Sequence, residues 1–201
     1  MSSKKKFSFE KAPDMAVKED VLGLVVKDGL KLEFADERLK NDKDIVYAAL
    51  AENPNAFRFV ADAMKFDEKV CLKCVSPYTW ALQFVPEQIR ADMEFALKAV
   101  NKYGGALRYL SNEAKDDHCI VLAAVQNCGS SLQYASQSMR GNEEIVRAAV
   151  GKFAHSFKFA DARLHRNKAF VLSLVKNSPG VMNYAHPQLQ GDKEIIAAMA
   201  V

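Results

Sequence analysis

A 25-residue period governs this chain and limits the folds it can adopt. Consecutive 25-residue segments align without a gap, and they begin at Val17, Asp42, Asp67, Asp92, Asp117, Asn142 and Asn167. A further segment, residues 192–201, contains only the first part of the unit. Periods of this length are typical of solenoids, in which each repeat buries its apolar surface only against its neighbours. The sequence therefore predicts one repeat domain over residues 17–201, preceded by a tail and partial repeat over residues 1–16, where Phe7 and Phe9 continue the pattern.

The first half of each repeat has the pattern of a short helix. We number positions 1 to 25 from the first residue of each repeat. Position 1 holds Asp or Asn in every repeat after the first, and these side chains favour helix N-caps. Positions 4, 5, 8 and 9 are mostly apolar, as in Ile45, Val46, Ala49 and Leu50, which places them on one helical face. Proline and glycine gather at positions 11 to 14, so the helix is expected to end there.

The second half of each repeat is marked by an aromatic residue at position 18. Apolar residues at positions 15, 16, 19 and 23 fit a second short helix. A strand at positions 16 to 18, as in leucine-rich repeats, is the alternative, but that pattern needs an Asn or Cys position after the strand, and none exists. The predicted fold is all-α: an α-solenoid of stacked short two-helix repeats with a 25-residue period. The position-18 residues are Phe34, Phe59, Phe84, Tyr109, Tyr134, Phe159 and Tyr184.

The repeats share the pattern Asp-x-x-hydrophobic-Val-x-x-Ala-Val, followed by Ala-Leu-x-Tyr-Ala. With this pattern the chain resembles the family known as domain of unknown function 4116, from about residue 17 to residue 201, and residues 117–141 match it best. The third repeat departs from it, with Cys71 and Cys74 in the Val and Ala positions. Similar repeats occur in proteins of intracellular bacteria, including candidate effectors, and of single-celled eukaryotes. No activity is established for the family, so the resemblance implies an architecture and not a reaction.

Composition indicates a folded, soluble protein. The chain has 201 residues, 49% of them hydrophobic, with a formal net charge of +3, whereas nucleic-acid binders usually carry a stronger basic excess. The basic run of residues 4–6 is followed by Glu10 and Asp14, which argues against a transit peptide. No apolar stretch is long enough to predict a membrane span. Cysteines in a chain without a signal peptide favour free thiols and a cytoplasmic location.

The cysteines and histidines do not form a recognisable catalytic or metal-binding pattern. Cys71 and Cys74 form a CxxC motif, but they occupy positions 5 and 8 on the predicted buried helix face, where Cys acts as a small hydrophobe. A redox CxxC needs a helix N-terminus, and a zinc site needs four ligands. We therefore expect a non-enzymatic protein with no catalytic residues, metal or cofactor. The histidines each occupy a different repeat position: His118, His155, His165 and His186.

Position 24 holds a cation in five consecutive repeats: Lys40, Lys65, Arg90, Lys115 and Arg140. A repeat position becomes a line along a solenoid, so this line is a candidate site for nucleic acid, phosphate or an acidic partner. The alternative is local, because each cation ends a short turn, where it complements the terminal carbonyl groups. Position 17 forms a second solvated line, of mixed sign.

Four aromatic residues are candidates for partner binding: Tyr78, Trp80, Tyr103 and Phe153. Exposed aromatic side chains anchor protein interfaces. The first three come from neighbouring repeats and are predicted to cluster on one edge. The alternative is that they fill gaps between turns.

These features predict a protein–protein interaction module that acts as an adaptor, a scaffold or a subunit of an assembly. Nucleic-acid or phosphate binding along position 24 is one alternative, and a bacterial effector that binds a host protein is another. The apolar terminal segment, residues 192–201, is a candidate surface for self-association. No membrane partner is expected.

Overall fold

The computed structural model describes residues 14–77 and 80–199, and all regular structure in these ranges is helical. The predicted all-α repeat solenoid is confirmed. The packing groups the chain into two compact units, residues 1–74 and 75–201, where the sequence predicts one repeat domain. Phe7, Phe9 and Tyr78 lie outside the described residues.

Each repeat contains three helical segments instead of the two that the sequence predicts. An α-helix starts at position 2 in the second to seventh repeats, whereas α1 of the first repeat starts earlier, at Asp14. A 3₁₀ helix covers the positions around 13 to 18, and a short helix follows from about position 21. The break falls at positions 19 and 20, where the backbone is extended. Ser136, at position 20, then caps the short helix, because its Oγ accepts a hydrogen bond from the backbone N–H of Met139 at 3.2 Å.

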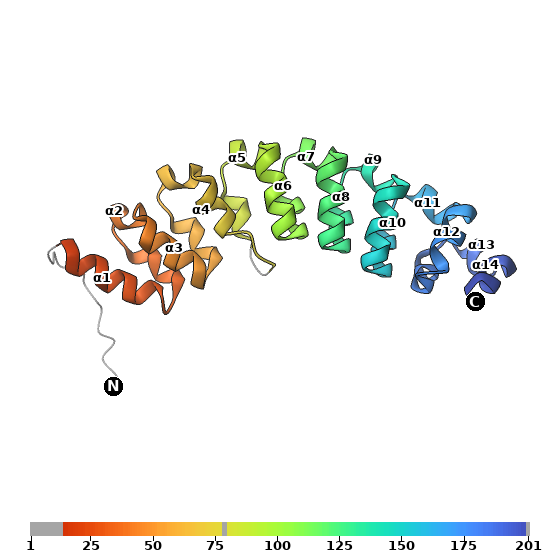
Figure 1. The fold of residues 1–201 in the computed structure, drawn as a ribbon, viewed down its shortest axis with the longest axis horizontal. Helices are drawn as coiled ribbons and strands as arrows, with labels where there is room; N and C mark the ends of the chain where they lie inside the picture. The colour runs from red at the N-terminus through yellow and green to blue at the C-terminus, as the bar shows by residue number, and fades with distance from the viewer. Residues whose placement is uncertain (1–13, 78–79, 200–201) are drawn as a thin grey trace, which may run out of the picture. The chain divides into compact units, whose positions relative to one another are not determined.

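The unit of residues 1–74 contains the first two repeats and the start of the third (Figure 1). The α-helices at the start of its repeats contact one another in order, and so do its first two 3₁₀ helices. Its elements are α1 (Asp14–Val25), η1 (Gly29–Phe34), α2 (Glu37–Lys40), α3 (Lys43–Glu52), η2 (Pro54–Phe59), η3 (Asp62–Phe66) and α4 (Glu68–Lys73).

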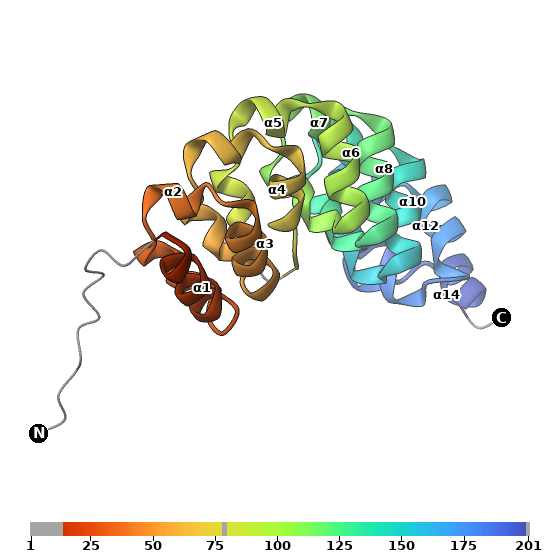
Figure 2. The same cartoon turned by 60° about the vertical axis from the view of Figure 1, so that its left-hand side comes forward.

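The unit of residues 75–201 has one layer of α-helices and one layer of 3₁₀ helices. Helices α6, α8, α10 and α12 lie side by side, and the short helices follow one edge of that row (Figures 1 and 2). Successive 3₁₀ helices contact one another in the same order. The α-helices are α5 (Glu87–Ala91), α6 (Met93–Lys102), α7 (Asn112–Asp116), α8 (His118–Asn127), α9 (Gln137–Arg140), α10 (Glu143–Lys152), α11 (Ala162–Arg166), α12 (Lys168–Val175), α13 (Pro187–Gln190) and α14 (Lys193–Met199). The 3₁₀ helices are η4 (Ala81–Phe84), η5 (Gly104–Tyr109), η6 (Gly129–Tyr134), η7 (Ala154–Phe159) and η8 (Pro179–Tyr184).

The boundary between the two units falls in the third repeat, whose first helix is short. Helix α4 ends at Lys73, whereas α3 and α6 continue to position 11. Pro77 occupies position 11 of this repeat, and a proline disfavours helical backbone at the residue before it. The turn of the third repeat, with Pro77, therefore accounts for the early end of α4, which lies next to the boundary between the two units.

The apolar positions form the core, as predicted. Ile45, Val46, Ala49 and Leu50 each expose 1% of their surface or less, and the same four positions are buried in α6, α8, α10 and α12. Burial of this apolar surface between neighbouring repeats is the main driving force for stacking.

Some neighbouring repeats approach so closely that only glycine fits between them. A Cβ atom built on Gly104 would lie 2.2 Å from the carbonyl oxygen of Ala124, in the next repeat. The backbone N–H of Gly104 instead donates to Oδ1 of Asn127 at 2.8 Å, and Nδ2 of Asn127 donates to the carbonyl oxygen of Asn101 at 2.9 Å. Position 13 is therefore a point of backbone contact between repeats.

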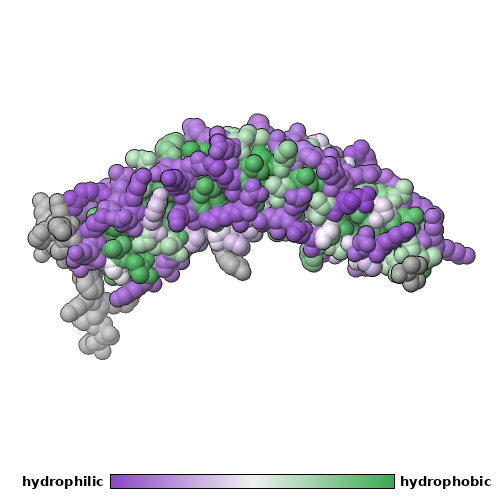
Figure 3. All heavy atoms as spheres, viewed as in Figure 1, coloured by the Kyte–Doolittle hydropathy of each residue, from purple (hydrophilic) through white to green (hydrophobic). Residues whose placement is uncertain are grey.

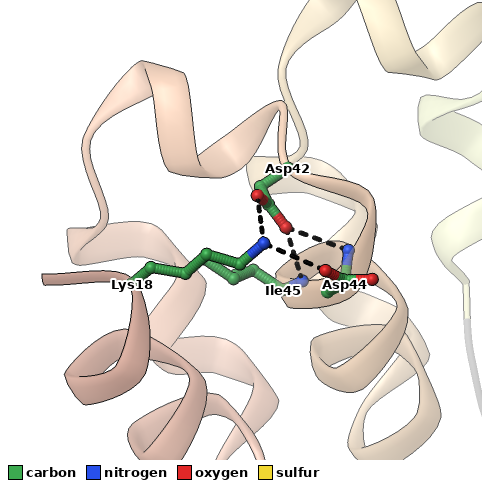
Figure 4. A network of polar contacts seen from close by, with 4 residues as sticks. All are labelled: Lys18, Asp42, Asp44 and Ile45. Atoms are coloured by element: carbon green, nitrogen blue, oxygen red, sulfur yellow. Dashed lines mark hydrogen bonds and ion pairs between the residues drawn. The ribbon is translucent and has the colours of Figure 1, made fainter. Parts of the chain in front are cut away.

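The position-1 side chains cap the α-helices and also join repeats by ion pairs (Figure 4). Oδ1 of Asp42 accepts hydrogen bonds from the backbone N–H groups of Asp44 and Ile45, at 3.0 and 3.3 Å. Nζ of Lys18, in the preceding repeat, lies 2.7 Å from Oδ2 of Asp42 and 2.9 Å from Oδ2 of Asp44. The same arrangement recurs where Lys168 contacts Asp192. The predicted N-caps are confirmed.

Candidate recognition surface

The 3₁₀ layer of residues 80–184 presents one repeated outward face. In a 3₁₀ helix the side chains at i and i+3 point the same way, so positions 14 and 17 share a side. Position 17 is exposed in all five repeats of this unit, and the position-18 rings beside it are half-buried or exposed. We call positions 14, 17 and 18 of these repeats the recognition face. Its position-17 residues are Gln83, Arg108, Gln133, Lys158 and Asn183.

Cations on the recognition face lie over its aromatic rings. The guanidinium carbon of Arg108 is 5.5 Å from the ring centre of Tyr109 and 5.9 Å from that of Tyr134, so it spans two repeats. Nζ of Lys158 lies 4.7 Å from the ring centre of Phe159. These cation–π contacts hold each charge above an aromatic surface while its side chain stays exposed.

An aromatic cluster that the sequence did not predict surrounds His155. Its ring centre lies 5.4 Å from that of Phe153, 6.3 Å from Phe159 and 5.1 Å from Tyr184. Nδ1 of His155 is hydrogen-bonded to the hydroxyl group of Tyr184, in the next repeat. The one feature of the sequence that could have indicated this cluster is the i, i+4 spacing of His155 and Phe159 within one repeat. Phe153, one of the predicted partner-binding residues, is 57% exposed at the edge of this cluster.

Trp80 and Tyr103 each contact a residue of their own repeat. Trp80 is 42% exposed, and its ring centre lies 5.5 Å from that of Phe84. The ring of Tyr103 covers Gly105, because a Cβ atom there would lie 2.5 Å from the ring. Tyr103 therefore fills the space next to a glycine. This is the gap-filling role that the sequence analysis gave as the alternative to partner binding. The predicted cluster of Tyr78, Trp80 and Tyr103 stays a prediction, since Tyr78 is outside the described residues.

Hydrophobic patches interrupt the polar surface of the face that Figure 3 shows. Large hydrophobic side chains are exposed in the unit of residues 75–201 on the 3₁₀ layer, on α6 and on α14. They are Trp80, Phe84, Met93, Leu97, Phe153, Ile196 and Met199.

Arg90 and His165, two of the position-24 side chains, are half-buried and turn toward backbone carbonyl groups, which differs from an open row of charges. Arg90 donates from Nε to the carbonyl oxygen of Val85 at 2.9 Å and from Nη1 to that of Tyr109 at 2.8 Å. His165 makes equivalent contacts, with Nδ1 at 2.7 Å from the carbonyl oxygen of Tyr184 and Nε2 at 3.1 Å from that of Ala160. Arg90 and His165 thus each link the end of one 3₁₀ helix to the end of the next.

The remaining predicted cations of this line are also partly enclosed. In the first unit, Nζ of Lys40 lies 3.0 Å from Glu37, and Nζ of Lys65 lies 2.9 Å from Asp62. In the second unit, burial and the nearby Arg90 lower the pKa of Lys115. Nε of Arg140 is buried without a hydrogen-bond partner. This enclosure favours the local role of the line over the anion-binding role.

The two cysteines of the CxxC motif lie in the core. Cys71 and Cys74 are both fully buried, as predicted, and their thiols donate to the carbonyl oxygens of Lys65 and Cys71, at 3.0 and 2.9 Å. Burial raises the pKa of the Cys71 thiol to about 12, and the charge of Asp67 adds to this effect. A thiol that resists ionisation is a poor nucleophile and a poor metal ligand. Within residues 14–77 and 80–199, no group of three or more His, Cys, Asp or Glu side chains is placed to bind a metal ion.

Helix α14 leaves part of its apolar face uncovered. Ile195 is buried, but Ile196 and Met199 are 51% and 38% exposed. Together with Met182, Asn183 and Gln190 they line an open hollow of about 400 Å³. The predicted self-association through this segment stays a prediction. No helix among the described residues is long and apolar enough to cross a membrane.

A model of one protein family matches most of the chain, in three consecutive segments. Its description is domain of unknown function, DUF4116, and the matched residues are 18–65, 67–113 and 117–165. Each segment covers about two of the 25-residue repeats. No curated protein and no solved structure matches the chain. The repeat architecture and the family match together place this chain in the DUF4116 family.

Proposed function

We propose that this protein is a non-enzymatic recognition module that binds a partner protein on the recognition face of residues 80–184. The observation that carries the proposal is the repeated, exposed pairing of an aromatic ring at position 18 with a cation or amide at position 17. Aromatic and arginine side chains supply much of the binding energy at protein interfaces. An adaptor, a scaffold and a subunit of an assembly would each use such a face.

The geometry of the repeats supports a role in recognition. Within each unit, the main contacts of the described helices are with helices of the same or the adjacent repeat. A stack of this kind supports a series of surface contacts better than a cleft in which distant polar side chains converge. Position 17 instead recurs along the stacked 3₁₀ helices and offers a series of equivalent contacts. A bacterial effector that binds a host protein would use the same surface.

The cysteines support a cytoplasmic setting for this function. All four are free, and Cys119 is exposed. Exposed thiols persist best in a reducing compartment.

Site-specific photocrosslinking tests the proposal. A photoreactive phenylalanine analogue replaces Trp80 on the recognition face, or Phe153 next to His155 of that face, and Leu97 on α6 serves as a control with similar exposure, 40% against 42% for Trp80. We expect one partner to crosslink from residues 80 and 153 and not from residue 97. The purified partner should then bind the wild-type chain and lose affinity for a Trp80→Ala, Phe153→Ala variant. Equal crosslinking from residue 97, or unchanged affinity of the variant, would reject this face as the binding site.

A further inference from the structure

From the distribution of charge we infer that the recognition face takes an extended, carboxylate-rich segment of its partner. This inference rests on the proposed function and specifies the chemistry of the ligand.

The 3₁₀ layer of the second unit carries no carboxylate. Positions 10 to 19 of its repeats are residues 76–85, 101–110, 126–135, 151–160 and 176–185, and none of them is Asp or Glu. The whole chain has 25 acidic and 28 basic residues, so acidic side chains are excluded from this layer and not from the protein. The cations in these stretches are Lys102, Arg108, Lys152, Lys158 and Lys176.

The first unit differs, although its repeats have the same architecture. Its positions 10 to 19 include Asp28, Glu33 and Glu52. Glu52 is used structurally, because its carboxylate accepts a hydrogen bond from the backbone N–H of Gly29. The fold therefore accommodates carboxylates in this layer, and their absence is a property of residues 75–201.

Amide and cationic side chains alternate along position 17 of the second unit. Gln83, Gln133 and Asn183 alternate with Arg108 and Lys158, and all five are exposed. Exposed amides can both donate and accept hydrogen bonds, as the backbone of an extended peptide requires. A phosphodiester backbone offers acceptors only, so the alternation favours an acidic peptide over a nucleic acid.

The spacing of the repeats also suits an extended peptide. Packed helices lie roughly 8–10 Å apart. A polyproline II helix advances about 9.3 Å in each three-residue turn. One turn of such a peptide therefore matches one repeat, and a carboxylate on every third residue meets position 17 in each repeat. Arg108 and Lys158, two repeats apart, would bind carboxylates about six residues apart.

Fluorescence anisotropy with synthetic probes tests the inference. The probes are labelled peptides of about 15 residues, five turns of polyproline II, built from repeated Glu-Ala-Pro or Gln-Ala-Pro, and single-stranded oligouridine of similar length. We expect the Glu-Ala-Pro peptide to bind with an affinity that falls as salt rises. The Gln-Ala-Pro peptide and oligouridine should bind at least tenfold more weakly.

Two charge-reversal variants provide the control. The Arg108→Glu, Lys158→Glu variant should bind the Glu-Ala-Pro peptide with an affinity about tenfold lower than the wild type, or lower still. Arg166→Glu with Lys193→Glu changes exposed cations outside the recognition face and should leave binding close to wild type. Both variants shift the formal net charge from +3 to −1, so non-specific attraction falls equally in the two. Circular dichroism confirms that each stays helical.

Each other outcome overturns the inference in a distinct way. Equal binding of the Gln-Ala-Pro peptide would show that charge is not recognised. Tighter binding of oligouridine, lost in the Arg108→Glu, Lys158→Glu variant, would identify nucleic acid as the ligand. If no probe binds while crosslinking from residues 80 and 153 still captures a partner, the acidic-segment inference fails and the proposed function stands.

Discussion

Arg90 and Tyr109, 19 residues apart, are joined by a hydrogen bond of 2.8 Å from Nη1 of the arginine to the carbonyl oxygen of the tyrosine. A second bond from Nε reaches the carbonyl oxygen of Val85 at 2.9 Å. The Arg90 side chain thus donates hydrogen bonds to backbone carbonyl groups at the ends of two successive 3₁₀ helices. A residue that the sequence offers as a ligand for anions is engaged in holding repeats together.

Replacing Arg90 with methionine should destabilise the protein by about 1–3 kcal/mol, because two partly buried carbonyl groups lose their donor. The matched control is Arg108→Met on the recognition face, which should change stability by less than about 0.5 kcal/mol. Urea unfolding followed by circular dichroism measures both. Equal stability of the two variants would contradict the linking role of position 24.

Gly104→Ala should destabilise the protein by about 1–3 kcal/mol, because the new methyl group meets the Ala124 carbonyl oxygen at 2.2 Å and the repeats must separate. Gly151→Ala is the control, since Gly151 lies within α10 and nothing is within 4 Å of its added Cβ. It should stabilise the protein by about 0.5–1 kcal/mol, as expected for a helical glycine. Thermal melts of both variants give the comparison.

Ser131→Ala with Ser156→Ala should leave stability unchanged or raise it by about 1 kcal/mol. Both hydroxyl groups are completely buried and have no hydrogen-bond partner, so their removal relieves a desolvation cost. Ala56, Ala81 and Ala106 occupy the same position 15 in other repeats, so alanine fits this site. A lower melting temperature would show that the hydroxyls have partners in solution.

Asp42 should make the stability of the first unit sensitive to acid. Burial acts to raise the pKa of Asp42, but hydrogen bonds from Lys18 and from the backbone N–H groups of Ile45 and Asp44 outweigh it, and the pKa is lowered from 3.8. A group with a depressed folded-state pKa contributes stability above its unfolded pKa and loses it as pH falls through the folded value. The melting temperature should therefore drop below about pH 4.

The control for this prediction is Asp42→Asn, which keeps a capping oxygen but cannot titrate. Asn142 caps α10 in this way in the wild-type chain. The melting temperature of the variant should depend less on pH between about 5 and 3 than that of the wild type. Parallel pH profiles would mean that other carboxylates dominate acid unfolding.

The four thiols should react with Ellman's reagent in the order of their exposure. Cys119 is exposed and Cys128 half-buried, so Cys119 should react first. Cys71 and Cys74 should react only after denaturant unfolds the chain, because both are buried and ionisation of Cys71 is suppressed. Loss of the fast phase in Cys119→Ser assigns it. Rapid modification of Cys71 in the folded protein would contradict its place in the core.

The repeat, the helical class, the N-caps and most of the core could be predicted from the amino-acid sequence. These depend on contacts within one repeat or between adjacent repeats, and such contacts leave a periodic signal, as at Asp42, Ile45 and Leu50. The split of the second helix also had a local signal in Ser111, Ser136 and Asp161 at position 20, but the apolar spacing across the break suggested one helix.

The surroundings of each surface position could not be predicted from the sequence and required the three-dimensional structure. Periodicity aligns Arg90 with Lys115 and Arg108 with Lys158, but it does not say which line faces solvent. That depends on the direction in which a 3₁₀ helix ends and on the carbonyl groups it brings within reach of a side chain. For this reason the position-24 side chains of Arg90 and His165 contact the carbonyl oxygens of Tyr109 and Tyr184. The position-17 side chains, which the sequence suggested were ordinary surface, form the exposed line of the recognition face.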